Sequence, residues 1–486
     1  MKLFFTGHGE KYAVEQTLLT LFPQERPVYP DEPPGGDNEL ELAFSRGPVW
    51  CTASAVLRRA GKPYARQCRV KTADLPPEDP VLATRLTRRT LQRAFYLAAV
   101  DCLGAEPPWG MLSGVRPVKL PTRAMEAGAT PRQAEAELRD RYRVSPERRR
   151  LAMDCAKASL EVKRSLKSEE VSLYVGIPFC PTRCAYCSFI SSSGSANRLI
   201  PDYLEALFRE IDRAGQALLA AGRRVRTVYI GGGTPTTLTG DQLRALLDRL
   251  HTAFRLDPGT EFTAAAGRPD TISRVRLAAI KAGGGTRISV NPQTMSDKVL
   301  SLIGRSHRAE DIRRAYALAR EMDAGYINMD LIAGLPGDDA DGFRDTLDQV
   351  LAMGPENITV HTLALKKGAR LKQEDLVLPD GPAVAAMLDF AWARLRAAGY
   401  EPYYLYRQKF MSGSFENVGW CLPGTGSEYN ICMMEELHTV LSLGAGGVTK
   451  GVAEGCVKRL ANPKYPQEYI RGIDEILAEK QNFFAF

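Results

Sequence analysis

The sequence predicts an α/β protein built around a parallel sheet, and three observations support this. Six strand-like runs in the middle of the chain are each followed by a helical segment. The composition, 44% apolar and 25% charged over 486 residues, is that of a globular protein of two or three domains. Three cysteines, Cys180, Cys184 and Cys187, follow the first of these strands and point to the chemistry.

The strand and helix patterns alternate regularly from about residue 170 to residue 400. Strands are predicted at 173–178, 225–231, 261–266, 286–291, 326–331 and 357–363. Helices are predicted at 201–221, 240–254, 271–282, 297–302, 309–322, 340–353 and 383–398. Strands joined by helices pair in parallel through right-handed crossovers. The result is either an open doubly wound sheet or a partial barrel, and in both the C-terminal ends of the strands carry the chemistry.

The rest of the chain divides by pattern into three further regions. Residues 1–105 mix strands at 2–6, 39–44 and 48–57 with a helix at 82–102, which predicts an α+β domain. Residues 106–168 are predicted to be a helical connector that contains an arginine-rich stretch at 139–150. The regular core occupies 169–400, and 401–486 form a smaller C-terminal region.

Charge and hydropathy restrict the function classes. The net charge is +7, a mild bias that suits an anionic small molecule or an acidic protein partner better than nucleic acid. No uncharged apolar run approaches the roughly 18 residues of a membrane span, and the first residues lack the apolar stretch of a signal peptide. We therefore expect a cytoplasmic chain whose ten cysteines are reduced thiols.

The three crowded cysteines have spacings of four and three residues, which let their thiolates converge from one loop. A structural zinc site normally has four closed ligands, and the chain has no second cysteine pair with that spacing. A [4Fe–4S] cluster usually takes four thiolates, so three would leave one iron open to an outside ligand. Three free buried cysteines, or a zinc site completed by a distant histidine, are the alternatives.

The pattern Cys-x3-Cys-x2-Cys after the first strand of such a core resembles the radical S-adenosylmethionine (SAM) superfamily. The resemblance implies a partial (β/α)6 barrel and a [4Fe–4S] cluster held by Cys180, Cys184 and Cys187. It also implies that the amino and carboxylate groups of SAM chelate the open iron. One electron from the cluster then cleaves SAM to methionine and a 5′-deoxyadenosyl radical.

Further motifs lie at the ends of the later strands. Gly231-Gly232-Gly233-Thr234-Pro235-Thr236 closes the second strand, where we expect glycine to allow close approach and to turn N–H groups towards a ligand. Asp330 lies in an apolar strand, which is costly unless a polar partner binds it. These segments resemble oxygen-independent coproporphyrinogen III oxidases, which implies SAM contacts at Tyr174, Tyr186, Gly232, Gly233, Thr234, Gln293, Arg305, Asp330 and Ala364.

Simpler interpretations exist for two of these positions. Arg305 could be a solvated charge at a helix end, and Tyr186 could do no more than pack beside the cluster. No residue is assigned to the chemical step itself.

The longer HemZ-type branch of that family is the most similar. It carries an N-terminal extension and two further motifs, which correspond here to Trp109-Gly110-Met111-Leu112-Ser113-Gly114-Val115-Arg116-Pro117-Val118-Lys119 and Tyr403-Tyr404-Leu405-Tyr406-Arg407-Gln408-Lys409. Two departures stand out. Phe189 replaces a fourth cysteine of the main branch, and Ala265 replaces the glutamate that relatives use to bind SAM. One lost charged hydrogen bond costs about 1.5–3 kcal/mol, or roughly ten- to a hundredfold in SAM affinity.

The resemblance implies coproporphyrinogen III dehydrogenase activity in haem (porphyrin) biosynthesis. Two propionates would be oxidatively decarboxylated to vinyls, giving protoporphyrinogen IX. Four carboxylates call for cations, and the expected ones are Arg116, Lys119, Arg407 and Lys409, although each could be a plain surface charge. The arginine-rich stretch 139–150 would bind an acidic flavodoxin or ferredoxin as electron donor, or would be a solvated helix face.

Three alternatives remain open at this point. One is a haem-binding chaperone, but that branch usually shows His-Asn-x-x-Tyr-Trp, whereas His438 is followed by Thr439 and Val440. Another is a radical SAM enzyme with a different substrate. The third is a non-catalytic paralogue, which the alanine at position 265 would suit.

Overall fold

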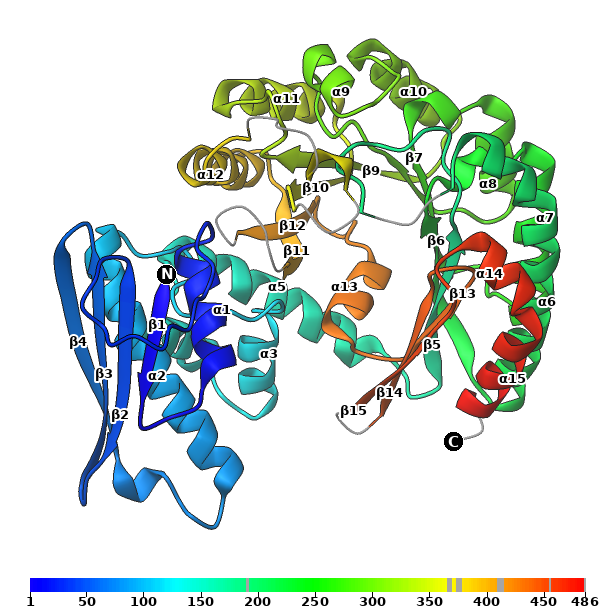
Figure 1. Ribbon diagram of the computed structural model, residues 1–486. Helices are drawn as coiled ribbons and strands as arrows, with labels where there is room; N and C mark the ends of the chain where they lie inside the picture. Colours follow the sequence, from blue (N-terminus) through cyan, green and yellow to red (C-terminus); the bar gives the residue numbers. More distant parts are fainter. Residues whose placement is uncertain (189–191, 365–368, 373–377, 409–414, 454–455, 485–486) are drawn as a thin grey trace. The chain divides into compact units, whose positions relative to one another are not determined.

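The computed structural model describes residues 1–188, 192–364, 369–372, 378–408, 415–453 and 456–484. The chain forms two compact units (Figure 1). The first is Met1–Met153 together with Phe415, and the second holds the other described residues from Asp154 onwards. The four-part division of the chain into 1–105, 106–168, 169–400 and 401–486 stays a prediction, and each unit is described by itself below.

The first unit contains a four-stranded sheet in the order β1-β2-β3-β4. Strand β1 is parallel to β2 and the other pairs are antiparallel; the bounds are β1 (Lys2–Thr6), β2 (Glu39–Arg46), β3 (Trp50–Arg59) and β4 (Lys62–Lys71). The predicted strands are present. Strand β4 was not predicted, because its lysines and arginines on a half-exposed edge hide the alternation of a strand.

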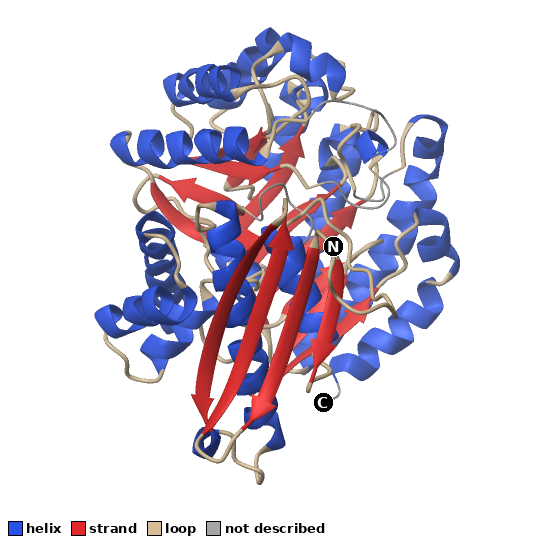
Figure 2. Ribbon diagram, turned by 60° about the vertical axis from the view of Figure 1, so that its left-hand side comes forward, coloured by secondary structure: helices blue, strands red, loops and turns tan. Residues whose placement is uncertain are grey.

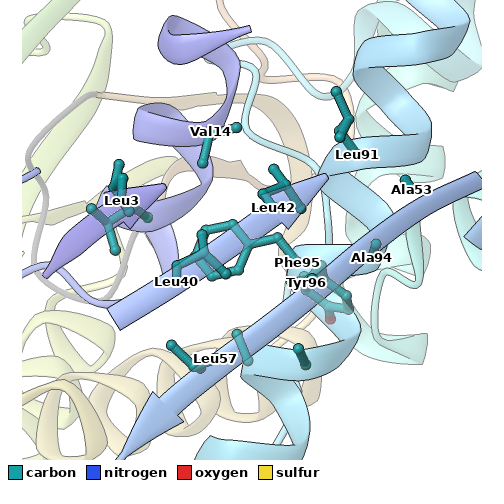
Figure 3. Packing of buried hydrophobic residues seen from close by; sticks show 14 of the residues in the cluster. Leu3, Val14, Leu40, Leu42, Ala53, Leu57, Leu91, Ala94, Phe95 and Tyr96 are labelled. Carbon is teal, nitrogen blue, oxygen red and sulfur yellow. The ribbon is translucent and has the colours of Figure 1, made fainter. Parts of the chain in front are cut away.

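Helix α2 (Pro80–Leu103) supplies most of the helical part of the first unit's core. Asp79 accepts a hydrogen bond from the Leu82 N–H at its start, and Gly104 ends it in the left-handed region (φ +71°). Figure 3 shows Phe95 of this helix packed among Leu40, Leu42 and Leu57 of the sheet. The other helices are α1 (Lys11–Leu21), α3 (Lys119–Glu126), α4 (Pro131–Ala136) and α5 (Pro146–Ser165), the last continuing into the second unit.

The second unit is built on six parallel strands that lie side by side in sequence order, as predicted. They are β5 (Glu170–Ile177), β6 (Arg224–Gly232), β7 (Glu261–Gly267), β8 (Arg287–Val290), β9 (Tyr326–Ala333) and β10 (Asn357–Thr362). A doubly wound sheet reverses its strand order near the middle, whereas this order runs on without reversal. The sheet is therefore a partial (β/α)6 barrel rather than a doubly wound sheet.

Helices connect these strands, as Figure 1 shows for the green and yellow part of the chain. Their bounds are α6 (Ile200–Ala220), α7 (Gly240–Phe254), α8 (Arg274–Ala282), α9 (Asp297–Leu302), α10 (Ala309–Glu321), α11 (Ala340–Met353) and α12 (Gly381–Ala397). Local sequence fixes their starts. Thr239 and Gln242 form a reciprocal capping box at α7, and Asp339 caps α11. None of the described helices is long and apolar enough to cross a membrane.

The C-terminal strands extend this sheet at both edges (labelled in Figure 1; all strands are red in Figure 2). Antiparallel β12 (Glu416–Cys421) follows β10 and pairs with β11 (Glu401–Arg407). At the other edge β13 (Val440–Leu443) is parallel to β5 and is followed by β14 (Val448–Ala453) and β15 (Cys456–Ala461). The remaining helices are α13 (Glu428–Glu435), α14 (Pro466–Arg471) and α15 (Ile473–Phe484). The parallel pairing of β13 was not predicted, because β13 lies outside the strand–helix alternation and its partner β5 is far away in the sequence.

The two faces of the six-stranded sheet differ in chemistry. Alternate residues such as Leu173, Val228 and Met329 are fully buried and form the apolar face. Side chains in a strand alternate between faces, so Tyr174, Tyr229 and Asp330 lie on the opposite, inner face, where each is only partly buried. The inner face of the barrel is therefore polar and aromatic, as a ligand-binding surface requires.

Candidate radical SAM site

The three cysteines lie in the loop that follows β5. All three are half-buried, and none of them forms a disulfide. The loop is fixed at its start, where the Cys180 N–H donates to the Ser192 carbonyl (2.9 Å), and at its middle, where the Ala185 N–H donates to the Ile303 carbonyl (2.9 Å). The Thr234 hydroxyl donates to the Cys180 Sγ at 3.4 Å. This bond ties the end of β6 to the first cysteine.

The arrangement of the cysteines bears on whether the loop could hold a single metal ion. Among the described residues, no three His, Cys, Asp or Glu side chains come close enough to hold one metal ion, so the zinc alternative gains no support. In an iron–sulfur cluster each thiolate binds a different iron, and the sulfurs are correspondingly farther apart. Thiols outside any disulfide, with hydrogen-bond donors at Cys180 and Cys184, suit a [4Fe–4S] cluster.

The glycine loop after β6 packs against the strand that leads into the cysteine loop. The Gly233 N–H donates to the Ile177 carbonyl (2.8 Å) and the Thr234 N–H to the Phe179 carbonyl (2.7 Å). A Cβ on Gly233 would lie 2.5 Å from the Phe179 carbonyl oxygen. The expectation that these N–H groups face a ligand is therefore wrong at both positions. Glycine is required here for close approach to the chain's own backbone.

Arg305 reaches back to the cysteine loop. Its Nη2 donates to the Tyr186 hydroxyl at 2.9 Å and its Nη1 to the Asn291 carbonyl at 3.1 Å. Arg305 is only 9% exposed, so the interpretation as a solvated helix-end charge is wrong. Burial opposes the charged form, but the nearby Tyr186 oxygen and Cys184 sulfur together raise the pKa of Arg305. The site thus holds a permanent positive charge close to the cysteines.

Gln293 and Asp330 meet across the C-terminal ends of β8 and β9. The Gln293 N–H donates to the Asp330 carbonyl (2.9 Å), and Gln293 adopts a left-handed backbone conformation (φ +68°). The Asp330 Oδ1 accepts a hydrogen bond from Asn328 Nδ2 (2.8 Å) and lies 3.8 Å from His361 Nε2. Burial raises the pKa of Asp330, but the interaction with the nearby His361 and the hydrogen bond from Asn328 outweigh it and lower the pKa. Asp330 is ionised and still 22% exposed, so it can accept from a ligand.

Tyrosines line the inner face beside these groups. Tyr174 stacks on Tyr229 (ring centroids 6.3 Å apart, planes at 15°), and Tyr229 stacks on Tyr429 (4.7 Å, 19°). Burial raises the pKa of Tyr174 to about 12, so this phenol is neutral near neutral pH. On the far side Tyr404 stacks on Tyr406 (6.4 Å, 9°). These rings give the interior flat, uncharged faces.

The residues predicted to contact SAM occupy one end of the barrel or its inner face. Direct bonds join Tyr186 to Arg305, Gln293 to Asp330, and Thr234 to Cys180. Ala364 is half-buried. It follows Leu363, whose N–H donates to the Ala333 carbonyl at the end of β10. Their roles as SAM contacts stay predictions.

Comparison with known proteins decides the family. Residues 174–350 match the Radical SAM superfamily. The chain is 34% identical over 475 residues to the oxygen-independent coproporphyrinogen-III oxidase-like protein HemZ of Bacillus subtilis, covering 96% of this chain and 94% of that one. The chain belongs to the radical SAM superfamily, in its HemZ-like family. The resemblance inferred from the motifs is confirmed.

Other radical SAM relatives cover less of the chain. The solved structure of coproporphyrinogen III oxidase (HemN) from Escherichia coli, described as a radical SAM enzyme, superimposes with a TM-score of 0.54 at 26% identity. It covers 66% of this chain and 73% of that one. The heme chaperone HemW of Escherichia coli is 28% identical over 63% of this chain and 77% of its own length. As for any radical SAM protein, a [4Fe–4S] cluster and SAM are the implied cofactors.

Ala265, the position at which the family resemblance implies a glutamate, lies in a β-bulge. Ala264 pairs with Ile288 and Gly267 with Val290, so two residues, Ala265 and Ala266, stand opposite one residue of β8. Bulges redirect side chains, often beside active sites. Ala265 is half-buried at this bulge, and its methyl group can supply no hydrogen bond.

The predicted cations are distributed over both units. Arg407, at the C-terminal end of β11, is buried beside its strand partner Glu416; burial lowers its pKa to about 10 while Glu416 opposes that change. Arg116 and Lys119 belong to the first unit. Lys409 and Phe189 lie outside the described residues. The part of the four predicted cations in binding propionates stays a prediction.

Acidic side chains pair with arginines of the stretch 139–150. Arg139 pairs with Asp140, Arg143 with Glu106 and Arg149 with Glu135; Arg141 pairs with Glu137, four residues before it. A cavity of about 580 Å³ opens beside Arg139, Arg143 and Arg149. Because these charges are largely matched locally, the stretch presents less positive charge to an acidic electron donor than its sequence suggests.

Proposed function

We propose that this radical SAM protein is an oxygen-independent coproporphyrinogen III dehydrogenase. It would convert two propionates of coproporphyrinogen III to vinyls with loss of CO2, giving protoporphyrinogen IX. The observation that carries the proposal is the similarity to HemZ over nearly the whole of both chains, which extends well beyond residues 174–350. Regions outside the barrel are where relatives of one superfamily differ most when their substrates differ.

The side chains on the inner face of the barrel are consistent with the proposed large, flat substrate. Stacked pairs from β5 and β6, and from β11, offer aromatic surface that a tetrapyrrole can lie against. The Tyr406 hydroxyl lies 3.5 Å from His361 Nδ1, and His361 in turn lies near Asp330. These groups supply hydrogen bonds that can orient polar substituents.

The chain's own residues would position the reactants. Cys180, Cys184 and Cys187 would hold the cluster, which together with SAM would supply the radical chemistry needed to remove a hydrogen atom from a substrate carbon. Asp330 can hold a hydroxyl or ammonium group, since it is ionised and partly exposed. Arg305 and Tyr186 keep the cysteine loop in place. For each propionate, one carbon–carbon bond to CO2 breaks and one electron leaves the substrate to an acceptor.

The decisive experiment is anaerobic turnover. The reconstituted protein would be incubated with SAM, a reductant, coproporphyrinogen III and a desalted cell extract as electron acceptor. We expect protoporphyrinogen and two molecules of 5′-deoxyadenosine per product, one for each propionate. Cys187→Ala removes a predicted cluster ligand. Its matched control is Cys456→Ala, at an exposed cysteine far from the loop in the sequence. Only Cys187→Ala should abolish both products.

Two results would redirect the assignment. 5′-Deoxyadenosine without protoporphyrinogen indicates a radical SAM enzyme with another substrate, and no SAM cleavage with tight haem binding indicates a chaperone. His438 gives the chaperone no support, because its Nε2 is hydrogen-bonded to the Ser172 hydroxyl (2.8 Å) and its side chain is buried. A histidine held in this way serves packing rather than haem ligation.

A further inference from the structure

Arg268 follows β7 and reaches the middle of the cysteine loop. Its Nη1 donates to the Thr182 carbonyl (3.1 Å) and hydroxyl (2.8 Å) and lies 3.9 Å from the Cys184 Sγ. The residue is 3% exposed. We propose that Arg268 is a positioning residue that holds the cysteine loop and stabilises the reduced cluster by its positive charge beside Cys184. This inference rests on the cluster implied by the proposed function.

The guanidinium is held on its other edge by a carboxylate. Nε and Nη2 donate to the two oxygens of Asp270 at 2.9 and 2.8 Å, and Nη2 also donates to the Ser306 hydroxyl at 3.3 Å. Such a forked pair fixes a planar group in orientation as well as position. Asp270 offsets part of the charge, but it binds the edge away from Nη1, so the positive end still faces Cys184.

The backbone around Arg268 is fixed as well. Gly267 adopts a left-handed conformation (φ +60°), which redirects the chain as β7 ends. The Arg268 carbonyl then accepts bonds from the Thr271 N–H (3.1 Å) and hydroxyl (2.9 Å). Because both the backbone and the guanidinium are anchored, the Nη1 group cannot turn away from the loop without breaking several bonds.

The electrostatic consequence follows from the cluster's charge. A [4Fe–4S] cluster with three thiolates is anionic, and it gains a further negative charge when it takes an electron. A cation close to a ligating sulfur stabilises the reduced form more than the oxidised form, and contacts to the sulfurs are among the factors that set cluster potentials. Burial of Arg268 strengthens this effect, since water screens the interaction less.

The test compares Arg268→Gln with wild type in the full chain after anaerobic reconstitution. We expect less iron and sulfide per chain and a tenfold lower reduced-to-oxidised ratio at a fixed potential, a shift of about 59 mV for one electron. Arg268→Lys keeps the charge, but a lysine ammonium cannot bind Asp270 and Thr182 at the same time as the planar guanidinium does. The iron content should therefore fall, while the reduction potential of the cluster stays nearer to that of wild type. If Arg268→Gln does not fold, Arg268→Lys provides the test.

The matched control is Arg276→Gln. Arg276 follows in the same segment and donates to the Leu238 and Thr271 carbonyls (2.8 and 3.2 Å), so its loss removes similar bonds away from the cysteine loop. Unchanged iron content and potential in Arg268→Gln, or effects no larger than those of the control, would overturn the proposal. Equal potential shifts in Arg268→Gln and Arg268→Lys would overturn the role of charge.

The outcome is separable from that of the proposed function. Iron content and reduction potential are measured without substrate. If both change in the Arg268 variants as expected, but the wild-type protein makes no protoporphyrinogen, only the proposed function is overturned. A wild-type chain that takes up no iron would overturn both.

Discussion

Tyr186 and Arg305 are 119 positions apart in the sequence, yet Arg305 Nη2 donates a 2.9 Å hydrogen bond to the Tyr186 hydroxyl. Tyr186 lies between two of the predicted cluster cysteines, and Arg305 follows α9. Burial raises the pKa of Tyr186, so its oxygen is a neutral phenol that accepts from a charged donor. One bond therefore connects the cysteine loop to the opposite side of the barrel mouth.

Tyr186→Phe should destabilise the chain even without a cluster. The change leaves a buried guanidinium N–H without its acceptor, which costs about 1–3 kcal/mol. Denaturant unfolding of the cluster-free protein measures this cost. Tyr465→Phe is the control, because Tyr465 is 50% exposed and should change stability little. A Tyr186→Phe variant as stable as the control would mean that Arg305 finds another partner.

Gly233→Ala should displace the cysteine loop. The new Cβ would lie 2.5 Å from the Phe179 carbonyl oxygen and 2.9 Å from that of Ile177, both backbone atoms that cannot swing aside. Overpacking of this kind costs typically about 1–3 kcal/mol, and we expect reduced iron content after reconstitution. Gly259→Ala is the matched control, since a Cβ there meets nothing within 4 Å. Equal iron content in both variants would show that the loop tolerates the shift.

The core of the fold followed from the sequence because its signals are local. Each of the six parallel strands is a run of apolar residues followed by an amphipathic helix, and the structure places all six in order. Strand β4 escaped prediction because charged residues on an exposed edge conceal its periodicity. Strand β13 escaped it because it lies outside the strand–helix alternation and pairs with the distant β5. Both strands are stabilised by pairing with neighbouring strands, and a local sequence pattern gives no information on that pairing.

The site was predictable in its residue types and not in its contacts. Motif similarity located Arg305, but a sequence cannot distinguish a solvated arginine from one buried against Tyr186. It also could not show that the Gly233 N–H is used by the Ile177 carbonyl. Arg268 follows the third predicted strand, yet its contact with Cys184 depends on the turn after β7 and on Asp270. Each of these facts is a pairing between distant segments.

Ala265→Glu should tighten SAM binding in the reconstituted protein. It restores the carboxylate that the family resemblance implies, and one charged hydrogen bond is worth about 1.5–3 kcal/mol, or roughly ten- to a hundredfold in affinity. Calorimetric titration with SAM measures the change. Ala265→Gln keeps the size without the charge and should gain less. If Ala265→Glu binds SAM no better than wild type, the bulge at this position directs the side chain elsewhere or other groups already compensate.

His438 should make the protein lose stability in mild acid. Burial lowers its folded-state pKa to about 4 from the ordinary 6.5, and the nearby negative charge of Glu170 offsets only part of this. The unfolded chain therefore binds more protons between these values, so stability present above pH 6.5 is lost as the pH falls towards 4. For His438 this amounts to about 2 kcal/mol between roughly pH 7.5 and pH 5.

Urea unfolding at several pH values checks this, with His438→Gln as the partner variant. Glutamine cannot titrate in this range, and its amide can still bond to the Ser172 hydroxyl that His438 contacts at 2.8 Å. The variant should therefore lose about 2 kcal/mol less than wild type over the same interval. Some acid sensitivity should persist, because burial also lowers the pKa of His307 to about 4. Identical pH profiles for the two proteins would mean that His438 is protonated in the folded state.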